Sequence, residues 1–273
     1  MSGIDDLRAL MARLRDPEQG CPWDCQQNFQ SIVPHTVEEA YEVADAMERG
    51  DREAMCDELG DLLFQVVFYA RLGEEEGSFD FEAIARGVHD KLIRRHPHVF
   101  ANHKAASTKT QRATWEAIKA KERQAKAGQS STPLSALDDV PLTLPALTRA
   151  RKLQSRAARV GFDWDASAPV VAKVREELAE LEQAMVAEPI DASHIAEEMG
   201  DLLFACVNLS RHLSVDPEQA LRAGNRKFER RFRGLEAVLA QSGEQVESAD
   251  FARLESAYQT AKASDKIDQN DPS

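Results

Sequence analysis

Residues 57–71 read DELGDLLFQVVFYAR, and residues 197–211 read EEMGDLLFACVNLSR. Both segments contain the run GDLLF, with a glutamate two residues before it and an arginine at the segment's end. Their flanking segments also correspond: EEAYE at 38–42 with EELAE at 176–180, and KLIRR at 91–95 with KFERR at 227–231. Matches that recur in the same order indicate an internal repeat, so the chain consists of two related modules.

Each module is expected to contain a pair of helices. In the first module, apolar residues recur at helical spacing from Thr36, a good N-cap, to Gly50. A second apolar stripe begins at residue 53 and is expected to end before Gly73. The second module repeats this pattern over 169–187 and 193–213.

No run of alternating apolar and polar residues predicts a strand, so the fold class is all-α. A helix hairpin cannot bury its apolar stripe alone. A four-helix-bundle arrangement is therefore expected, either within each module or shared between two subunits.

A change of composition separates the modules. Residues 127–145, AGQSSTPLSALDDVPLTLP, carry Gly, Ser and three prolines, which is typical of a linker. We expect an N-terminal module at 1–126, a linker at 127–146, a C-terminal catalytic module at 147–265 and a disordered tail at 266–273.

The overall charge and hydropathy narrow the class of protein. The 273 residues carry a net charge of −13, which would repel a nucleic-acid polymer. No apolar run approaches the roughly 20 residues that cross a bilayer, and the first 20 residues lack a signal-peptide core. The four cysteines match neither a disulfide framework nor a paired zinc motif. We therefore expect a cytoplasmic protein with no membrane association.

Part of the excess of acidic residues is concentrated in the repeated segments. Glu177 and Glu180 lie three residues apart, as do Glu198 and Asp201, so each pair shares a helix face. Antiparallel packing of the two helices would bring the four carboxylates together, which is costly without a cation. The first copy has the same acids at Glu39, Glu42, Glu58 and Asp61.

Two observations favour a site over a solvated surface. Asp201 lies inside the apolar run MGDLLFACV, and each ExxD motif encloses a glycine, Gly60 or Gly200. A glycine in a helix costs about 1 kcal/mol relative to alanine, so we expect another helix or a ligand to approach closely there.

The proposed ligands are all oxygen, which favours Mg²⁺, with Mn²⁺ as a substitute, over zinc or copper. A di-iron bundle would need Glu-x-x-His, which no histidine of the chain provides. Magnesium bound by carboxylates takes further ligands from phosphates. Each copy also offers a KxxRR cluster, Lys91 to Arg95 and Lys227 to Arg231, as cationic partners.

These motifs together resemble the MazG family of nucleoside triphosphate pyrophosphohydrolases, in its two-domain bacterial form. The family motif is EExxE followed by ExxD, and the resemblance extends over GCPWD (20–24), RRHPHVF (94–100), VGFDW (160–164) and NRKFERRF (225–232). It implies tandem MazG-like helical modules, a homodimer, Mg²⁺ dependence, and hydrolysis of NTPs or dNTPs to a monophosphate and pyrophosphate.

The resemblance also implies roles for residues. Glu177, Glu180, Glu198 and Asp201 would bind metal, and Lys173, Lys227, Arg230 and Arg231 would bind phosphates. Tyr258 stands where relatives often carry tryptophan against the nucleotide. Glu176 or Glu177 could activate water as the catalytic base.

The two copies differ in the cationic residue that precedes the acids. Lys173 lies four residues before Glu177, whereas His35 lies four residues before Glu39, so we expect the C-terminal copy to carry most of the hydrolysis. Two alternatives stay open at this point. One is a non-enzymatic helical regulatory protein, and the other is a narrower enzyme acting on dUTP or a damaged nucleotide.

Overall fold

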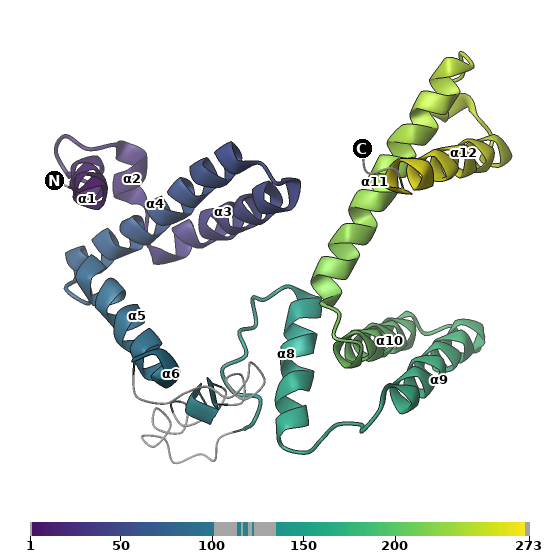
Figure 1. The fold of residues 1–273 in the computed structure, drawn as a ribbon, viewed down its shortest axis with the longest axis horizontal. Helices are drawn as coiled ribbons and strands as arrows, with labels where there is room; N and C mark the ends of the chain where they lie inside the picture. Colours follow the sequence, from purple (N-terminus) through teal and green to yellow (C-terminus); the bar gives the residue numbers. More distant parts are fainter. Residues whose placement is uncertain (1, 101–113, 116, 120–121, 123–134, 271–273) are drawn as a thin grey trace. The chain divides into compact units, whose positions relative to one another are not determined.

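The computed structural model describes residues 2–100, 114–115, 117–119, 122 and 135–270, with the side chains of the last five omitted. The described residues form helices and turns and contain no strand. The chain divides into two compact units, Met1–Gln129 and Ser130–Ser273, and each is described by itself. Figure 1 shows their helices. No described helix is long and apolar enough to cross a membrane.

The first unit is built around a helix hairpin. Its helices are α1 (Gly3–Leu14), α2 (Pro22–Gln26), α3 (Phe29–Arg49), α4 (Arg52–Glu76), α5 (Phe81–Arg95) and α6 (Pro97–Phe100). Helices α3 and α4 lie side by side, and α1 packs on α4 (Figure 1). The apolar faces of these three helices meet in a core formed by Met11, Ile32, Val67, Phe68 and Leu72.

The second unit repeats the hairpin. Its helices are α8 (Ala146–Arg159), α9 (Ser167–Val186), α10 (Ala192–His212), α11 (Pro217–Gln241), a 3-10 turn η1 (Val246–Ser248) and α12 (Phe251–Asn270). Helix α10 packs on both α9 and α8, as α4 packs on α3 and α1. Helices α11 and α12 form a further hairpin with its own core of Leu235, Leu239 and Ala257.

The first long helix begins earlier than predicted. The side chain of Asn28, not that of Thr36, caps α3, because its Oδ1 accepts hydrogen bonds from the backbone N–H groups of Gln30 and Ser31. Thr36 lies inside the helix and donates to the carbonyl oxygen of Ile32 at 3.1 Å. The prediction that Gly50 closes this helix is confirmed, since Gly50 adopts the left-handed conformation with φ 73°.

Helix α4 continues through Gly73, where we expected it to end. A Cβ at this position would lie 2.6 Å from the carbonyl oxygen of Phe79, so the glycine permits the segment after the helix to pack closely against it. The helix ends instead at Gly77, whose φ is 69°.

The glycines of the two ExxD motifs do not meet another helix. Apart from the adjacent residues and the backbone of the same helix turn, no atom lies within 4 Å of a Cβ built on Gly60 or on Gly200. The close approach expected from the sequence is therefore not made within the described part of one chain.

Parts of the predicted linker and tail have structure. Residues 127–134 of the predicted linker lie outside the described residues, but Arg156 of α8 donates to the carbonyl oxygens of Asp138 and Asp139. Val140 is buried, so this part of the segment packs in the second unit. Helix α12 extends to Asn270, beyond the predicted start of a disordered tail at 266, while residues 271–273 lie outside the described residues.

Candidate active site

The acids of the second unit converge between two helices. Glu177 and Glu180 of α9 and Glu198 of α10 each offer a carboxylate oxygen, and these oxygens lie within 4.8 Å of one another. Asp201, the fourth predicted ligand, lies outside this group of three but lines an adjacent pocket together with Glu177. The sequence predicts this convergence from i,i+3 spacing within each helix together with antiparallel packing of the two helices.

The first unit contains a corresponding cluster. Oxygens of Glu39 from α3 and of Glu58 and Asp61 from α4 lie within 4.8 Å of one another. Glu42 lies outside this group of three. Each copy therefore brings three of its four predicted ligands together, and the acid left out differs between the copies.

The carboxylates resist ionisation where they meet. Burial, and then the charge of Glu177, raises the pKa of Glu180. In the first unit, burial and then Asp61 raise the pKa of Glu39, and burial and then Glu42 raise that of Glu58. All these donors are hard oxygens, and a divalent cation would offset their mutual repulsion. The donor set therefore fits Mg²⁺ or Mn²⁺.

Lys173 provides a cation beside the second cluster. Its Nζ lies 2.6 Å from Glu176 Oε1 and 2.8 Å from Glu177 Oε1. The hydrogen bond to Glu176, and then that to Glu177, raises the pKa of Lys173. The corresponding His35 of the first unit lies 3.9 Å from Glu38 and packs edge-on against Trp23. A fixed positive charge is thus present at this position in the second copy only.

The remaining predicted phosphate ligands lie on the α11–α12 hairpin. Lys227 is exposed, and Tyr258 packs against Phe228 with ring centroids 6.3 Å apart. Arg230 and Arg231 both form ion pairs with Asp265 of α12, at 2.9 Å for Arg231. These hydrogen bonds, that of Arg230 first, lower the pKa of Asp265 to about 2. None of these residues lines the pocket beside the acids.

The two arginines of the first unit's KxxRR motif also form ion pairs with a carboxylate. Arg94 and Arg95 lie 2.7 Å and 2.5 Å from the two carboxylate oxygens of Glu122. The hydrogen bond from Arg95 is the main cause that lowers the pKa of Glu122 to about 2. Each KxxRR motif is thus paired with a carboxylate about thirty residues later in the chain, which the sequence reasoning did not identify.

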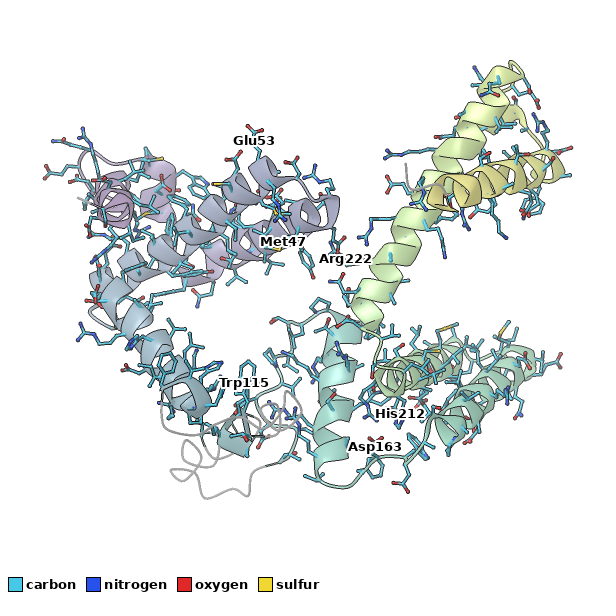
Figure 2. The ribbon with its side chains drawn as sticks, viewed as in Figure 1. Met47, Glu53, Trp115, Asp163, His212 and Arg222 are labelled. Atoms are coloured by element: carbon cyan, nitrogen blue, oxygen red, sulfur yellow. The ribbon has the colours of Figure 1, made fainter. Side chains whose placement is uncertain are left out.

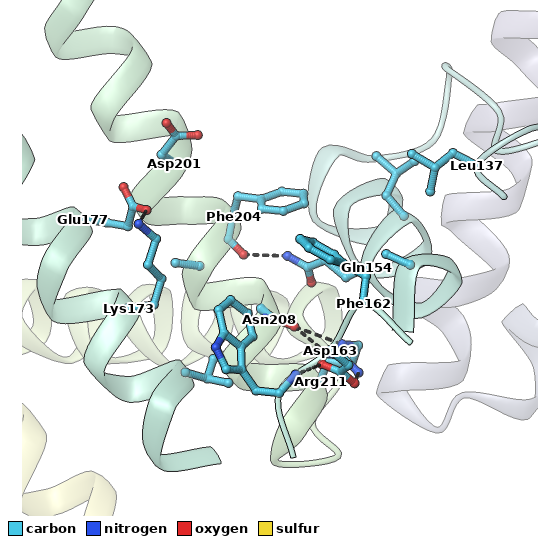
Figure 3. Close-up of a pocket in the computed structure, with 15 residues that line it drawn as sticks. Leu137, Gln154, Phe162, Asp163, Lys173, Glu177, Asp201, Phe204, Asn208 and Arg211 are labelled. Atoms are coloured by element: carbon cyan, nitrogen blue, oxygen red, sulfur yellow. Dashed lines mark hydrogen bonds and ion pairs between the residues drawn. The ribbon is translucent and has the colours of Figure 1, made fainter. Parts of the chain in front are cut away.

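A pocket of about 460 Å³ lies among α8, α9 and α10 (Figure 3). Lys173, Glu177 and Asp201 line part of its wall. The rest of the wall is mostly aromatic, aliphatic and amide in character, with Gln154, Phe162, Trp164, Phe204 and Asn208. The charged pair Asp163 and Arg211 also lines it. The pocket therefore combines charged groups suited to phosphate and metal with a mostly apolar wall suited to an organic group.

An ion-pair network holds the loop between α8 and α9 at this pocket. Arg211 Nη1 donates to Asp163 Oδ2 at 2.8 Å, and His212 Nε2 lies 3.0 Å from Asp163 Oδ1. The hydrogen bonds from Arg211 are the main cause that lowers the pKa of Asp163 to about 2. Figure 2 labels Asp163 and His212 where the loop meets α10.

The chain is similar to known proteins along most of its length. The model of the MazG nucleotide pyrophosphohydrolase domain matches residues 27–100 and again residues 167–234. A nucleoside triphosphate pyrophosphohydrolase of Escherichia coli is 51% identical over 262 residues, which cover 96% of this chain and 98% of that protein.

This chain belongs to the MazG nucleotide pyrophosphohydrolase family.

Two further relatives show how far the likeness extends. The nucleoside triphosphate pyrophosphohydrolase/pyrophosphatase MazG of Thermotoga maritima is 41% identical over 96% of this chain and 97% of its own length. The uncharacterized protein YabN of Bacillus subtilis is 39% identical over 95% of this chain, but over only 52% of its own length. The family and the all-α fold with two MazG modules, both expected from the sequence motifs, are confirmed.

The two MazG segments contain both acid clusters, Lys173 and both basic motifs. They leave out Gln154 and Asp163, which line the pocket, and Tyr258 and Asp265, which lie on α12. The sequence reasoning did not single out the pocket amides. One signal could have found Asn208: within the aligned repeat it stands where the first copy has Phe68, a polar residue in place of an apolar one.

Proposed function

We propose that this chain is a nucleoside triphosphate pyrophosphohydrolase, which uses Mg²⁺ or Mn²⁺ to hydrolyse NTPs or dNTPs to a nucleoside monophosphate and pyrophosphate. One observation carries the proposal: carboxylates of α9 and α10 converge beside Lys173 at the wall of a mostly apolar pocket. The names of the E. coli and T. maritima relatives support it.

Water is added across the anhydride bond between the α- and β-phosphates. The bridging P–O bond breaks, one product keeps the bridging oxygen, and the other receives the oxygen of water. Glu177, Glu180, Glu198 and Asp201 would hold the metal, which when bound neutralises phosphate charge and acidifies water. Lys173 lies at the pocket wall, where its ammonium group would pair with a phosphate oxygen.

Glu176 is a suitable proton acceptor for the attacking water. It lies outside the group of three converging acids, and its carboxylate is held by Lys173 at 2.6 Å. Glu177 belongs to the group of three, so its role as a ligand competes with a role as base.

The basic hairpin would complete the site by closing over the phosphates. Lys227, Arg230, Arg231 and Tyr258 lie on α11 and α12 rather than around the pocket. We propose that these residues reach the nucleotide when the hairpin of the same chain or of a second copy covers the acids. The phosphates would then compete with Asp265 for the two arginines.

A homodimer accounts for the open faces of the MazG hairpins. The α9–α10 hairpin exposes several large apolar side chains, namely Leu178, Met185, Met199 and Leu203. Open space also surrounds Gly200. A second hairpin packed on these residues would form the four-helix bundle expected of the module. We propose a cytoplasmic enzyme, since that compartment holds the nucleotide pool, with no nucleic-acid polymer as a partner.

Product analysis tests the proposed function. The purified chain is incubated with Mg²⁺ and a panel of NTPs and dNTPs, and the products are separated by ion-exchange chromatography. We expect monophosphate and pyrophosphate in equal amounts. Diphosphate with orthophosphate would contradict the proposal, and no hydrolysis of any triphosphate would favour the non-enzymatic regulatory protein.

A further inference from the structure

Two carboxamide side chains are buried in the wall of the pocket beside the acids. Gln154 of α8 and Asn208 of α10 are each only 7% exposed, although both line the pocket. Buried amides normally have hydrogen-bond partners for their oxygen and their nitrogen. The partners of these two amides therefore indicate what the pocket can bind.

Only one of the two polar atoms of the Gln154 amide has a hydrogen-bond partner among the described residues. Its Nε2 donates to the carbonyl oxygen of Phe204 at 2.8 Å, which fixes the nitrogen toward α10 (Figure 3). Its Oε1 is buried and accepts no hydrogen bond from the described residues. An unpaired buried acceptor costs free energy, and at a pocket wall this cost is recovered when a ligand supplies the donor.

The Asn208 amide is oriented by an arginine. Arg211 donates to Asn208 Oδ1 through Nε at 3.0 Å and through Nη2 at 2.8 Å. Because a guanidinium group only donates, the atom that faces it must be the amide oxygen. The Nδ2 of Asn208 is thereby left as a donor for another partner. The pocket thus offers one acceptor, on Gln154, and one donor, on Asn208.

The first module carries an apolar residue at the position of Asn208. In the aligned repeat, Phe68 occupies the position of Asn208. Phe68 is 1% exposed and packs with Met11 of α1, the helix that lies on α4 as α8 lies on α10. The side chains packed around Phe68 are apolar, although Gln65 of the same helix is also buried, whereas the second module has amides facing a cavity. Because this exchange gives up apolar packing, it indicates a ligand rather than a structural role.

We propose that this pocket binds the nucleobase of the substrate, and that Gln154 and Asn208 are substrate-binding residues that form hydrogen bonds with its edge. Every common nucleobase carries a donor next to an acceptor on one edge, which matches the acceptor and donor of the two amides. Trp164 and Phe204 supply aromatic surface for the ring faces. The charged end with Lys173 and Glu177 lies in the same pocket, which places the phosphates beside the acids.

Binding requires a small movement. Gln154 Oε1 is enclosed in the free protein, so contact with a base requires rotation of the terminal amide. The last torsion of glutamine is broad, and interface side chains commonly change rotamer on binding. The assignment of the triphosphate rests on the proposed function, whereas binding of a nucleoside by the pocket can be measured without it.

Steady-state kinetics of Gln154→Met test the assignment. Methionine has a similar size and removes the amide. Loss of one hydrogen bond to the base should raise KM for each NTP roughly three- to tenfold, with little change in kcat. Ribose 5-triphosphate, which lacks a base, should be hydrolysed by the variant and by the unchanged chain with the same KM. Equal KM values for an NTP in both proteins, or an equal rise for ribose 5-triphosphate, would overturn the assignment.

The first module provides a matched control. Gln65 is 6% exposed and also has a buried Oε1 with no partner among the described residues, but it belongs to α4 of the other unit. Gln65→Met therefore makes the same chemical change at the same burial. We expect this variant to keep the KM of the unchanged chain. A rise equal to that of Gln154→Met would show that loss of a buried amide, not of base contact, is responsible.

A binding measurement separates this inference from the proposed function. The chain has three tryptophans, and Trp164 alone of them lines the pocket. With Trp23→Phe and Trp115→Phe, fluorescence reports Trp164, and adenosine or uridine alone should change it saturably. Gln154→Met in that background should weaken the response severalfold. If the nucleosides leave the fluorescence unchanged, the base assignment is wrong even if the enzyme hydrolyses NTPs. If they bind but no NTP is hydrolysed, the proposed function fails and the pocket assignment stands.

Discussion

Lys173 Nζ lies 2.8 Å from Glu177 Oε1, and both side chains line the same pocket. The ammonium group thus neutralises part of the carboxylate charge that would otherwise attract a metal ion. It also lies where a substrate phosphate would have to come. Lys173 is therefore expected to have opposite effects on metal binding and on catalysis.

Replacing Lys173 by Met should separate these effects. Metal binding should become tighter, because the acids lose a competing cation, so half-maximal thermal stabilisation should need less Mg²⁺. Turnover should fall roughly tenfold or more, because a charge-assisted phosphate contact is lost. Arg175→Met removes the same charge from the same helix at an exposed position and should leave both properties unchanged. Weaker metal binding by the Lys173 variant would contradict this prediction.

The raised pKa of Glu180 leads to a stability prediction with a definite sign. Burial and Glu177 raise this pKa, so the folded chain binds the proton more tightly than the unfolded chain does. Ionised Glu180 therefore destabilises the metal-free protein above about pH 4.5. Glu180→Gln should raise the melting temperature in EDTA at pH 7.5, and the difference should shrink as the pH falls toward 4.5.

Adding Mg²⁺ should reverse the order of the melting temperatures of the unchanged chain and of Glu180→Gln. The unchanged chain should gain thermal stability from the metal, while Glu180→Gln should gain much less, because a ligand is missing. Glu182→Gln, on the same helix but exposed, should behave like the unchanged chain. Equal metal-induced shifts for Glu180→Gln and the unchanged chain would show that Glu180 is not a ligand.

The two modules should differ in activity. Glu180→Ala with Glu198→Ala should abolish pyrophosphate release, because these acids converge beside Lys173 and the pocket. Glu42→Ala with Glu58→Ala should leave most of it, since the first cluster has His35 in place of the lysine. Pyrophosphate release is measured for both double variants at saturating NTP. The prediction is wrong if the first-module pair abolishes turnover and the second-module pair does not.

The ion pair of Asp163 should make stability depend on acid pH. Arg211 lowers the pKa of Asp163 to about 2, so its contribution is complete above the unfolded value near 4 and is lost as the pH falls to 2. Asp163→Asn should therefore lower the melting temperature at pH 7 by a few degrees, and the difference should disappear near pH 2. A difference that is constant over this pH range would exclude the ion pair as its cause.

The proposed dimer can be tested on the open face of α10. Leu203 is 52% exposed, and a charge there should oppose packing of a second hairpin. Sedimentation should show twice the chain mass for the unchanged protein and a single chain mass for Leu203→Asp, with reduced turnover. Leu142→Asp is the control, because Leu142 is 82% exposed but lies outside the MazG hairpins. A monomeric unchanged chain with full activity would refute the dimer as a functional requirement.

The sequence predicted the parts of the structure that depend on local spacing. The convergence of Glu177, Glu180 and Glu198 follows from i,i+3 spacing on two consecutive helices, and the repeat showed that the pattern was not accidental. The predicted helix ends were less accurate, because tertiary contacts override local sequence signals there. Thr36 is a good capping residue but lies within α3, and Gly73 permits contact with Phe79 instead of ending α4.

The pocket and the ion pairs of the arginines with Asp265 could not be predicted from local spacing. Gln154 meets Phe204 across 50 residues, and Arg231 meets Asp265 across 34 residues. Such contacts depend on how separate helices pack, and no spacing rule within one helix reports them. Only the repeat carried a trace of the pocket, in the replacement of Phe68 by Asn208.

Phe68 has a consequence for binding stoichiometry. Its ring closes the core of the first module, yet Glu39, Glu58 and Asp61 still converge nearby. A chain of this kind has two places with the ligands for a divalent cation, and we expect only the second, which lies beside the pocket, to bind a nucleoside. Calorimetric titration should therefore saturate at one nucleotide per chain, while metal ions continue to bind at a second, nucleotide-independent class of site.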